Sequence, residues 1–251
     1  MRTTKLALSV LAAVAMTAAF SPGAAIAAPT GAGAPAVSAA ARTYAYDFSS
    51  SAQGWTADFA DYHEINDANG SLERDSGIRP LPEGTAAGNG FYIQGHNRSD
   101  DLFMFFRHRL GPEDGIVPGQ RYSVQTSVTF WTHEPECIGS GGGGGAAQYV
   151  KAGASTAEPT VSRDEAGRYR VRLDKANQAN SGTESKVLGN AANGLECGDH
   201  TWTQVTRTSR TAVTVQADNA GYLWLHFGTD SGYEGLNQLY YSAVASTLTA
   251  L

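Results

Sequence analysis

The chain has 251 residues, of which 41% are hydrophobic and only 17% are charged, whereas about a quarter of an average soluble domain is charged. Removing Arg2 and Lys5, which lie in a segment we expect to be cleaved off, from the 18 basic residues leaves 16 against 24 acidic ones, a net charge of −8. This balance argues against general affinity for nucleic acids or anionic membranes, although it does not exclude a local basic groove.

Residues 1–27 are typical of an export signal. A positive start is followed by an apolar run over 6–20, too short to span a bilayer comfortably, and by the Ala-Ile-Ala cleavage pattern at 25–27. The alternative, a membrane anchor, has no support from any later long apolar stretch. We therefore expect a secreted, extracellular protein without a membrane partner, in which 28–41 form a flexible Ala/Pro/Gly leader and 42–251 form one domain.

The first half of the domain predicts short strands separated by polar loops. Strands are expected over 43–48, 89–94 and 102–110, with at most one more within 57–77. The run 102–106 is almost continuously apolar, which fits a strand buried on both faces or a turn of buried helix. The clearest strand is 121–133, where Val124, Val128 and Phe130 alternate with small polar residues and Trp131.

The second half continues in the same way. Residues 134–146 hold five consecutive glycines, Gly141–Gly145, and predict a mobile loop. Short strands are expected over 148–153, 168–175, 200–207 and 212–217, with an Asn/Gly-rich loop over 175–199. The segment 221–248 predicts a hairpin: a strand, an acidic glycine-rich loop over 228–235, and a second strand.

These elements amount to about ten strands with no convincing amphipathic helix. Short alternating strands separated by turn signals favour an all-β fold, specifically a two-sheet β-sandwich of the jelly-roll type. The two cysteines, Cys137 and Cys197, each lie beside a glycine in an expected loop. Export favours a disulfide between them, the alternative being two free buried thiols.

Three motifs resemble the jelly-roll carbohydrate-binding modules of secreted bacterial enzymes. They are Tyr-Asp-Phe at 46–48 with Gly-Trp at 54–55, Pro-Gly-Gln-Arg-Tyr at 118–122, and Leu-Tyr-Tyr-Ser-Ala-Val at 239–244. The resemblance implies a jelly-roll domain that binds an extracellular polysaccharide. Ser242 stands where such modules often carry an aspartate that serves a structural calcium site, which puts a calcium ion in doubt.

Sugar binding needs flat aromatic faces and short polar side chains. The sequence offers the aromatic candidates Trp55, Trp131, Trp202, Trp224, Tyr233 and Tyr240, and the polar candidates Asp100, Asp101, Asp230 and Asn237. We predict Trp55, Trp131, Tyr233, Asp100, Asp101 and Asn237 as the ligand-binding set. The alternative is that these aromatic residues are part of the core.

Acidic loops also offer hard oxygen ligands for calcium. If an ion binds, we expect Asp47, Asp230 and Glu234 to hold it. The chain lacks EF-hand spacing, and the alternative is that these acids are simply solvated.

The strand Gln-Tyr-Val-Lys-Ala-Gly at 148–153 is similar to one in jelly-roll alginate lyases. That resemblance implies a catalytic Tyr149 assisted by His133 and Arg109 or Arg107, but the other motifs of those lyases are missing. Spacing typical of sandwich glucanases, serine hydrolases or zinc proteases is also missing. The preferred interpretation is a secreted, non-catalytic glycan-binding protein; the alternatives are a lyase acting on uronate polymers and a structural or adhesive surface protein.

Overall fold

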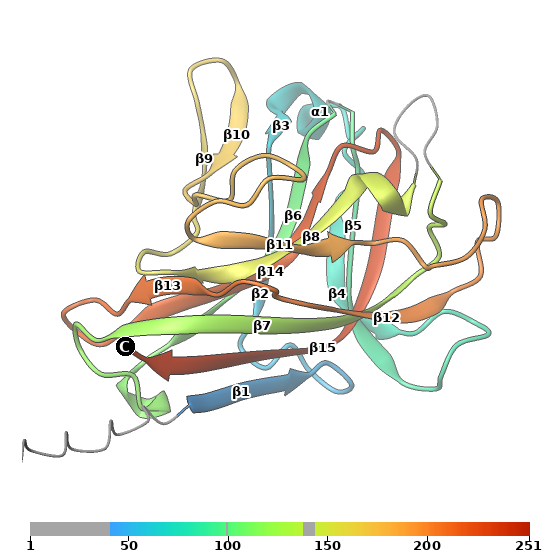
Figure 1. Ribbon diagram of the computed structural model, residues 1–251. Coiled ribbons are helices and arrows are strands. Elements are labelled where there is room, and N and C mark those ends of the chain that lie inside the picture. Colours follow the sequence, from blue (N-terminus) through green and yellow to red (C-terminus); the bar gives the residue numbers. More distant parts are fainter. Residues whose placement is uncertain (1–40, 99, 138–143) are drawn as a thin grey trace, which may run out of the picture. The chain divides into compact units, whose positions relative to one another are not determined.

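The structure is a computed structural model that describes residues 41–98, 100–137 and 144–251 (Figure 1). The predicted export signal, nearly all of the predicted leader and the glycines at 141–143 lie outside the described residues. Among the residues that are described, no helix has the length and apolar character needed to cross a membrane.

Almost all regular structure is antiparallel β-sheet. The larger sheet has seven strands in the order β12-β7-β15-β5-β4, with β1 added beside β15 and β13 beside β7. Its members are β1 (Ala41–Asp47), β4 (Asp75–Pro80), β5 (Asn89–His96), β7 (Arg121–Thr132), β12 (Thr203–Thr208), β13 (Val213–Gln216) and β15 (Leu236–Ala250).

A second sheet has five strands in the order β11-β8-β14-β6-β2. They are β2 (Thr56–Ala60), β6 (Leu102–Leu110), β8 (Gln148–Ser155), β11 (Ser185–Asn190) and β14 (Leu223–Ser231). A small third sheet joins β3 (Tyr62–His63), β10 (Arg168–Val171) and β9 (Val161–Arg163), beside a short helix α1 (Glu64–Ala68). The predicted all-β sandwich is confirmed, although more of the chain forms strands than we expected.

The core lies between the two large sheets, where alternating side chains from each meet. Phe227 of β14 lies with its ring 5.0 Å from Tyr241 of β15 and 5.0 Å from Phe106 of β6. All three rings are fully buried, and burying a side chain of this size stabilises a fold by about 1.5–3 kcal/mol. The two sheets are therefore held together by a continuous aromatic layer.

A second apolar layer covers the outer face of the five-stranded sheet. Phe103 and Phe105 of β6 stack with ring centres 4.7 Å apart and pack against Val171, Leu173 and Val161 from the segment that carries β9 and β10. Strand β6 is thus buried on both faces. This explains the continuous apolar run at 102–106 and shows that the run forms a strand and not a turn of buried helix.

The predicted hairpin at 221–248 is wrong in its pairing. Strand β14 pairs with β6 and β8, whereas β15 pairs with β1, β5 and β7 of the other sheet. The chain therefore crosses between sheets here. Gly228 lies within β14, where a Cβ would meet the Met104 carbonyl oxygen at 2.1 Å, so this glycine permits close strand approach rather than a turn.

Three other expectations need correction. Strict alternation along the strand predicted at the end of 221–248 would place Val244 on the face of Tyr240, but a register shift between Tyr241 and Ala243 turns it into the core. The segment 57–77 contains β2, β3, α1 and the start of β4, and the expected loop 175–199 contains β11. Short strands with few apolar residues leave little periodicity to detect.

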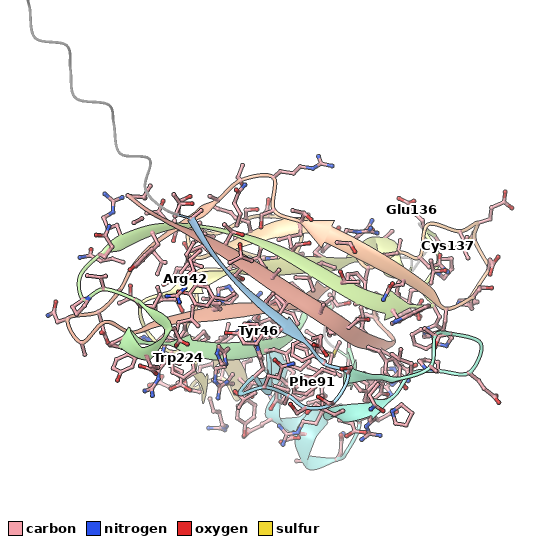
Figure 2. The ribbon with its side chains drawn as sticks, turned by 90° about the horizontal axis from the view of Figure 1, so that it is seen from below. Arg42, Tyr46, Phe91, Glu136, Cys137 and Trp224 are labelled. Carbon is pink, nitrogen blue, oxygen red and sulfur yellow. A yellow bond between two sulfur atoms is a disulfide. The ribbon has the colours of Figure 1, made fainter. Side chains whose placement is uncertain are left out.

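The disulfide between Cys137 and Cys197 is confirmed. It joins the segment after β7 to the segment before β12, two neighbouring strands of the seven-stranded sheet. Figure 2 shows Cys137 at the opposite end of the sandwich from Trp224.

Candidate functional site

The predicted ligand-binding residues do not form one site. Trp55 is 3% exposed, with its ring stacked on His108 and touching Tyr46 and Phe227. Its faces are therefore covered by the core. Asn237 is fully buried and donates a hydrogen bond to the Gly235 carbonyl oxygen at 2.9 Å, so its side chain stabilises the turn before β15.

The other members of that set are scattered. Tyr233 is partly buried in the connection between β14 and β15, Asp100 is exposed, and Asp101 belongs to a charged cluster described below. Trp131 is different, because it lies partly exposed on the outer face of the seven-stranded sheet, at the end of β7.

Trp131 belongs to a row of aromatic residues that crosses three neighbouring strands. Tyr240 of β15 lies directly opposite Trp131 of β7 on one side and directly opposite Tyr92 of β5 on the other. The rings of Tyr92 and Tyr240 are 4.7 Å apart, and Trp202, just before β12, meets Tyr240 edge-on at 5.4 Å. We call Trp131, Trp202, Tyr240 and Tyr92 the aromatic row.

The members of the row differ in exposure. Trp131, Trp202 and Tyr240 are partly exposed, whereas Tyr92 is only 4% exposed and supports the ring of Tyr240. His133 packs against Trp202 with ring centres 4.3 Å apart. The accessible platform therefore consists of two tryptophans and one tyrosine.

Neutral hydrogen-bonding groups border the aromatic row. Gln238 donates to the Tyr92 hydroxyl at 2.9 Å, and Gln204 donates to the Ser242 hydroxyl at 3.2 Å. The guanidinium of Arg79 lies 4.9 Å from the centre of the Tyr92 ring and forms an ion pair with Asp75 at 2.5 Å. The positive charge of Arg79 beside Tyr92 is thus neutralised by Asp75.

A shallow groove of about 250 Å³ lies on the same face. Its floor is made of small side chains from three strands, namely Ala45, Ser127, Thr129, Ala243 and Ala245. Thr129 also donates to or accepts from the hydroxyl of Thr206 at 2.9 Å. The exposed carboxylate of Asp47 also lines the groove. The outer face of this sheet therefore combines aromatic rings with small side chains and one acid.

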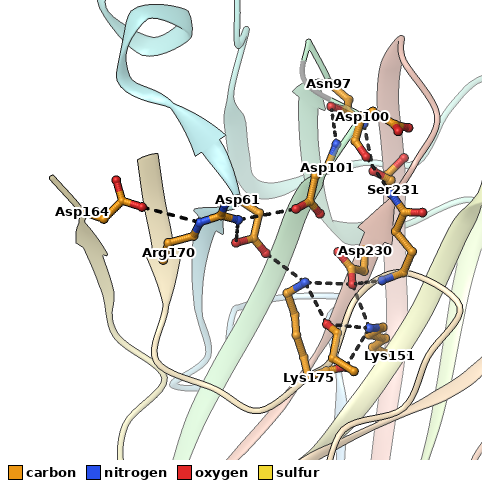
Figure 3. Close-up of polar contacts among 12 residues, drawn as sticks. Asp61, Asn97, Asp100, Asp101, Lys151, Asp164, Arg170, Lys175, Asp230 and Ser231 are labelled. Atoms are coloured by element: carbon orange, nitrogen blue, oxygen red, sulfur yellow. Dashed lines mark hydrogen bonds and ion pairs between the residues drawn. The ribbon is translucent and has the colours of Figure 1, made fainter. Parts of the chain in front are cut away.

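A second group of polar residues lies buried on the outer face of the five-stranded sheet (Figure 3). Asp230 of β14 and Lys151 of β8 are both completely buried, and an oxygen of Asp230 lies 2.8 Å from the Lys151 nitrogen. The same oxygen lies 2.8 Å from the Lys175 nitrogen, which in turn lies 2.9 Å from Asp61. Arg170 forms an ion pair with Asp61 at 2.9 Å and lies 3.5 Å from Asp101.

The pKa values of the two lysines shift in opposite directions. Burial lowers the pKa of Lys151, and the Asp230 carboxylate offsets this only in part. Burial acts on Lys175 in the same direction, but the carboxylates of Asp230 and Asp61 outweigh it and raise the pKa of Lys175 above its ordinary value. Burial, reinforced by Asp61, raises the pKa of Asp101 to about 6.

The residues predicted to hold calcium do not come together. Asp47 is exposed at the end of β1 and accepts a hydrogen bond from the Ser49 amide, and Glu234 is exposed after β14. Asp230 instead lies with Asp61 and Asp101, whose oxygens all fall within 4.8 Å.

This carboxylate cluster does not fit a metal ion. A calcium ion needs six to eight oxygen ligands at about 2.3–2.6 Å. The ammonium group of Lys175 already contacts both Asp61 and Asp230 at hydrogen-bond distance. The lysines and Arg170 therefore supply the positive charge that a cation would bring.

The residues of the lyase alternative are also far apart. Tyr149 and Arg109 lie on the five-stranded sheet, but Tyr149 pairs opposite Asp230 and Arg109 opposite Trp224. These two positions on β14 are six residues apart, about 20 Å along a strand. His133 follows β7 of the other sheet and packs on Trp202. The structure does not bring the three together for acid–base chemistry.

No protein-family model matches the chain, and no curated protein matches it. Among solved structures, it resembles the xylan-binding domain from CBM 22 with 14% identity over 86% of this chain and 97% of that one, at a TM-score of 0.35. It also resembles TmCBM27, a carbohydrate-binding module that recognises mannan, with 10% identity over 83% and 98% at a TM-score of 0.36.

A third structure is the K3 cleaved adhesin domain of Lys-gingipain from Porphyromonas gingivalis, with 13% identity over 83% and 99% at a TM-score of 0.37. Carbohydrate-binding modules are thus among the structures that the chain resembles, as the sequence motifs led us to expect. Likeness at these scores carries no argument about function, which depends on the geometry of this chain.

Proposed function

We propose that this protein is a secreted, non-catalytic glycan-binding protein whose contact surface is the aromatic row on the seven-stranded sheet. The observation that carries the proposal is the cross-strand register, which places Trp131 and Tyr240 side by side with Trp202 against Tyr240. Rings fixed in this way present apolar faces to a sugar without paying for ordering on binding.

The polar groups at the border supply the second requirement. Gln204, Gln238 and Ser242 carry amides and a hydroxyl that can exchange hydrogen bonds with sugar hydroxyls. The export signal expected over 1–27 and the disulfide both agree with an extracellular setting. A row of partly exposed rings on an open sheet face suits a polymer surface or chain better than a small enclosed ligand.

Retention on a panel of insoluble polysaccharides tests the proposal. We expect the mature protein to be retained on at least one of them. Trp131→Ala and Tyr240→Ala should each weaken the affinity roughly 10- to 100-fold, because each removes an aromatic contact worth about 1.5–3 kcal/mol when buried by a sugar.

Trp224→Ala is the matched control. Trp224 is also a partly exposed tryptophan, but it lies on the other sheet, opposite Arg109 and Ser155, and its replacement should leave retention unchanged. Thermal unfolding of each variant shows whether it is folded. Retention that survives in both row variants, or that Trp224→Ala abolishes equally, would contradict the proposed surface.

A further inference from the structure

We propose that the side chains of Lys151 and Asp230 join in a spontaneous amide bond, which cross-links strands β8 and β14 inside the folded protein. This covalent cross-link is independent of the glycan surface, which lies on the other sheet. The proposal rests on the position, burial and surroundings of the two side chains.

The two reacting groups are held in direct contact. The Lys151 nitrogen lies 2.8 Å from an Asp230 oxygen, and both side chains are completely buried. The nitrogen also donates to the carbonyl oxygen of Lys175 at 2.8 Å, which fixes its position. Because the nitrogen touches the carboxylate whose carbon it would attack, the reaction is intramolecular and does not have to bring the two groups together.

The strand geometry supports this placement. Lys151 pairs opposite Gly228, so Asp230 is its diagonal neighbour on the same face of the sheet. Phe103 lies on the adjacent strand, 5.0 Å from the Lys175 nitrogen, and keeps this face apolar.

The charges around the pair favour Lys151 over Lys175 as the nucleophile. An amine attacks only in its neutral form. Burial lowers the pKa of Lys151, whereas Lys175, held between Asp61 and Asp230, keeps its proton more strongly. Lys175 can therefore stay charged and stabilise the negative oxygen that develops on Asp230 during the attack.

The reaction balances without any further reagent. A proton passes from the Lys151 ammonium to the Asp230 carboxylate that it contacts. The amine then attacks the carboxyl carbon, a C–N bond forms, and one carboxyl oxygen leaves as water with that proton and one from the nitrogen. Asp101, whose pKa burial raises to about 6, can hold and return a proton near neutral pH. A pocket of about 320 Å³ lies next to the pair, bordered by Asp61 and by Lys175, which contacts Asp230. The reaction removes one positive and one negative charge, so the net charge of the cluster does not change.

Intact-mass measurement of the mature, reduced and denatured protein tests the proposal. The expected mass is that of the sequence less one water molecule. Trypsin should then release a branched product in which 122–163, uncut at Lys151, is joined to 211–251, since no lysine or arginine follows Arg210. Wild-type protein at full mass would overturn the proposal, as would a cross-link that maps to Lys175.

Two variants and a control separate this bond from other losses of water. Lys151→Met should restore the full mass, and Asp101→Asn should shift the purified protein from mostly linked to mostly unlinked. Lys186→Met removes a lysine outside the cluster and should lose the water as the wild type does. A loss of water that persists in Lys151→Met would place it elsewhere, for example at Asp114-Gly115, and overturn the assignment; full linkage in Asp101→Asn would remove the role of Asp101.

Discussion

Replacing Asp230 by alanine should lower the free energy of unfolding by about 3–5 kcal/mol, the usual cost of leaving a buried charge, here the Lys175 ammonium, without its partner. Asp230 accepts hydrogen bonds from the Lys175 ammonium at 2.8 Å and from the Gln178 amide at 2.7 Å, and it contacts Lys151. Its removal leaves the buried Lys175 ammonium with only one of its two carboxylates, Asp61. Urea unfolding followed by tryptophan fluorescence measures the change.

Asp164→Ala is the matched control for this substitution. Asp164 belongs to the rim of the same cluster, 3.9 Å from Arg170, and its side chain is 40% exposed. Exposed ion pairs contribute about 0–1 kcal/mol, so this variant should unfold nearly as the wild type does. If Asp230→Ala cost no more than Asp164→Ala, the cluster would not hold the β9–β10 segment against the sheet.

Removing the disulfide with Cys137→Ser and Cys197→Ser should cost about 4 kcal/mol, since the bridge closes a loop of 60 residues in the unfolded chain. The effect should reach the aromatic row as well, because Trp202 follows Cys197 by five residues and His200 contacts the His133 carbonyl oxygen at 3.2 Å. Thermal unfolding of oxidised and reduced wild type beside the double variant provides the measurement.

The reduced wild type is the internal control for this experiment, because it loses the bond without a change of sequence. Both forms should unfold at the same lower temperature. A double variant as stable as the oxidised protein would show that the two loops are held by other contacts.

Period-2 alternation carried most of what could be predicted from the sequence. It located β7 and put Trp131 on its polar face. The strand at 102–106 was indicated instead by a continuous apolar run, as one of two alternatives. It failed where local pattern and tertiary pairing disagree. The glycine and acid at 228 and 230 resemble a loop, but the close packing of β14 on β6 makes them part of a buried strand.

The sites depend on pairings that one strand cannot reveal. Trp131, Tyr240 and Tyr92 form a row only through the register of β7, β15 and β5, and nothing in any one strand indicates that register. The shared oxygen of Asp230 likewise depends on Lys175, which is 55 residues away in the chain. The expected calcium ligands Asp47, Asp230 and Glu234 share only Asp230 with this cluster, because 228–235 resembles an acidic loop and its sequence gives no sign of Lys175.

The indole signals of the four tryptophans provide the most direct test of the proposed glycan surface. Nitrogen-15 NMR of the mature protein should be recorded while soluble oligosaccharides of the retained polysaccharide are added. We predict that the signals of Trp131 and Trp202 shift while those of Trp55, which is in the core, and Trp224, on the other sheet, stay in place. Shifts confined to Trp224, or binding that moves none of the four signals, would contradict the account.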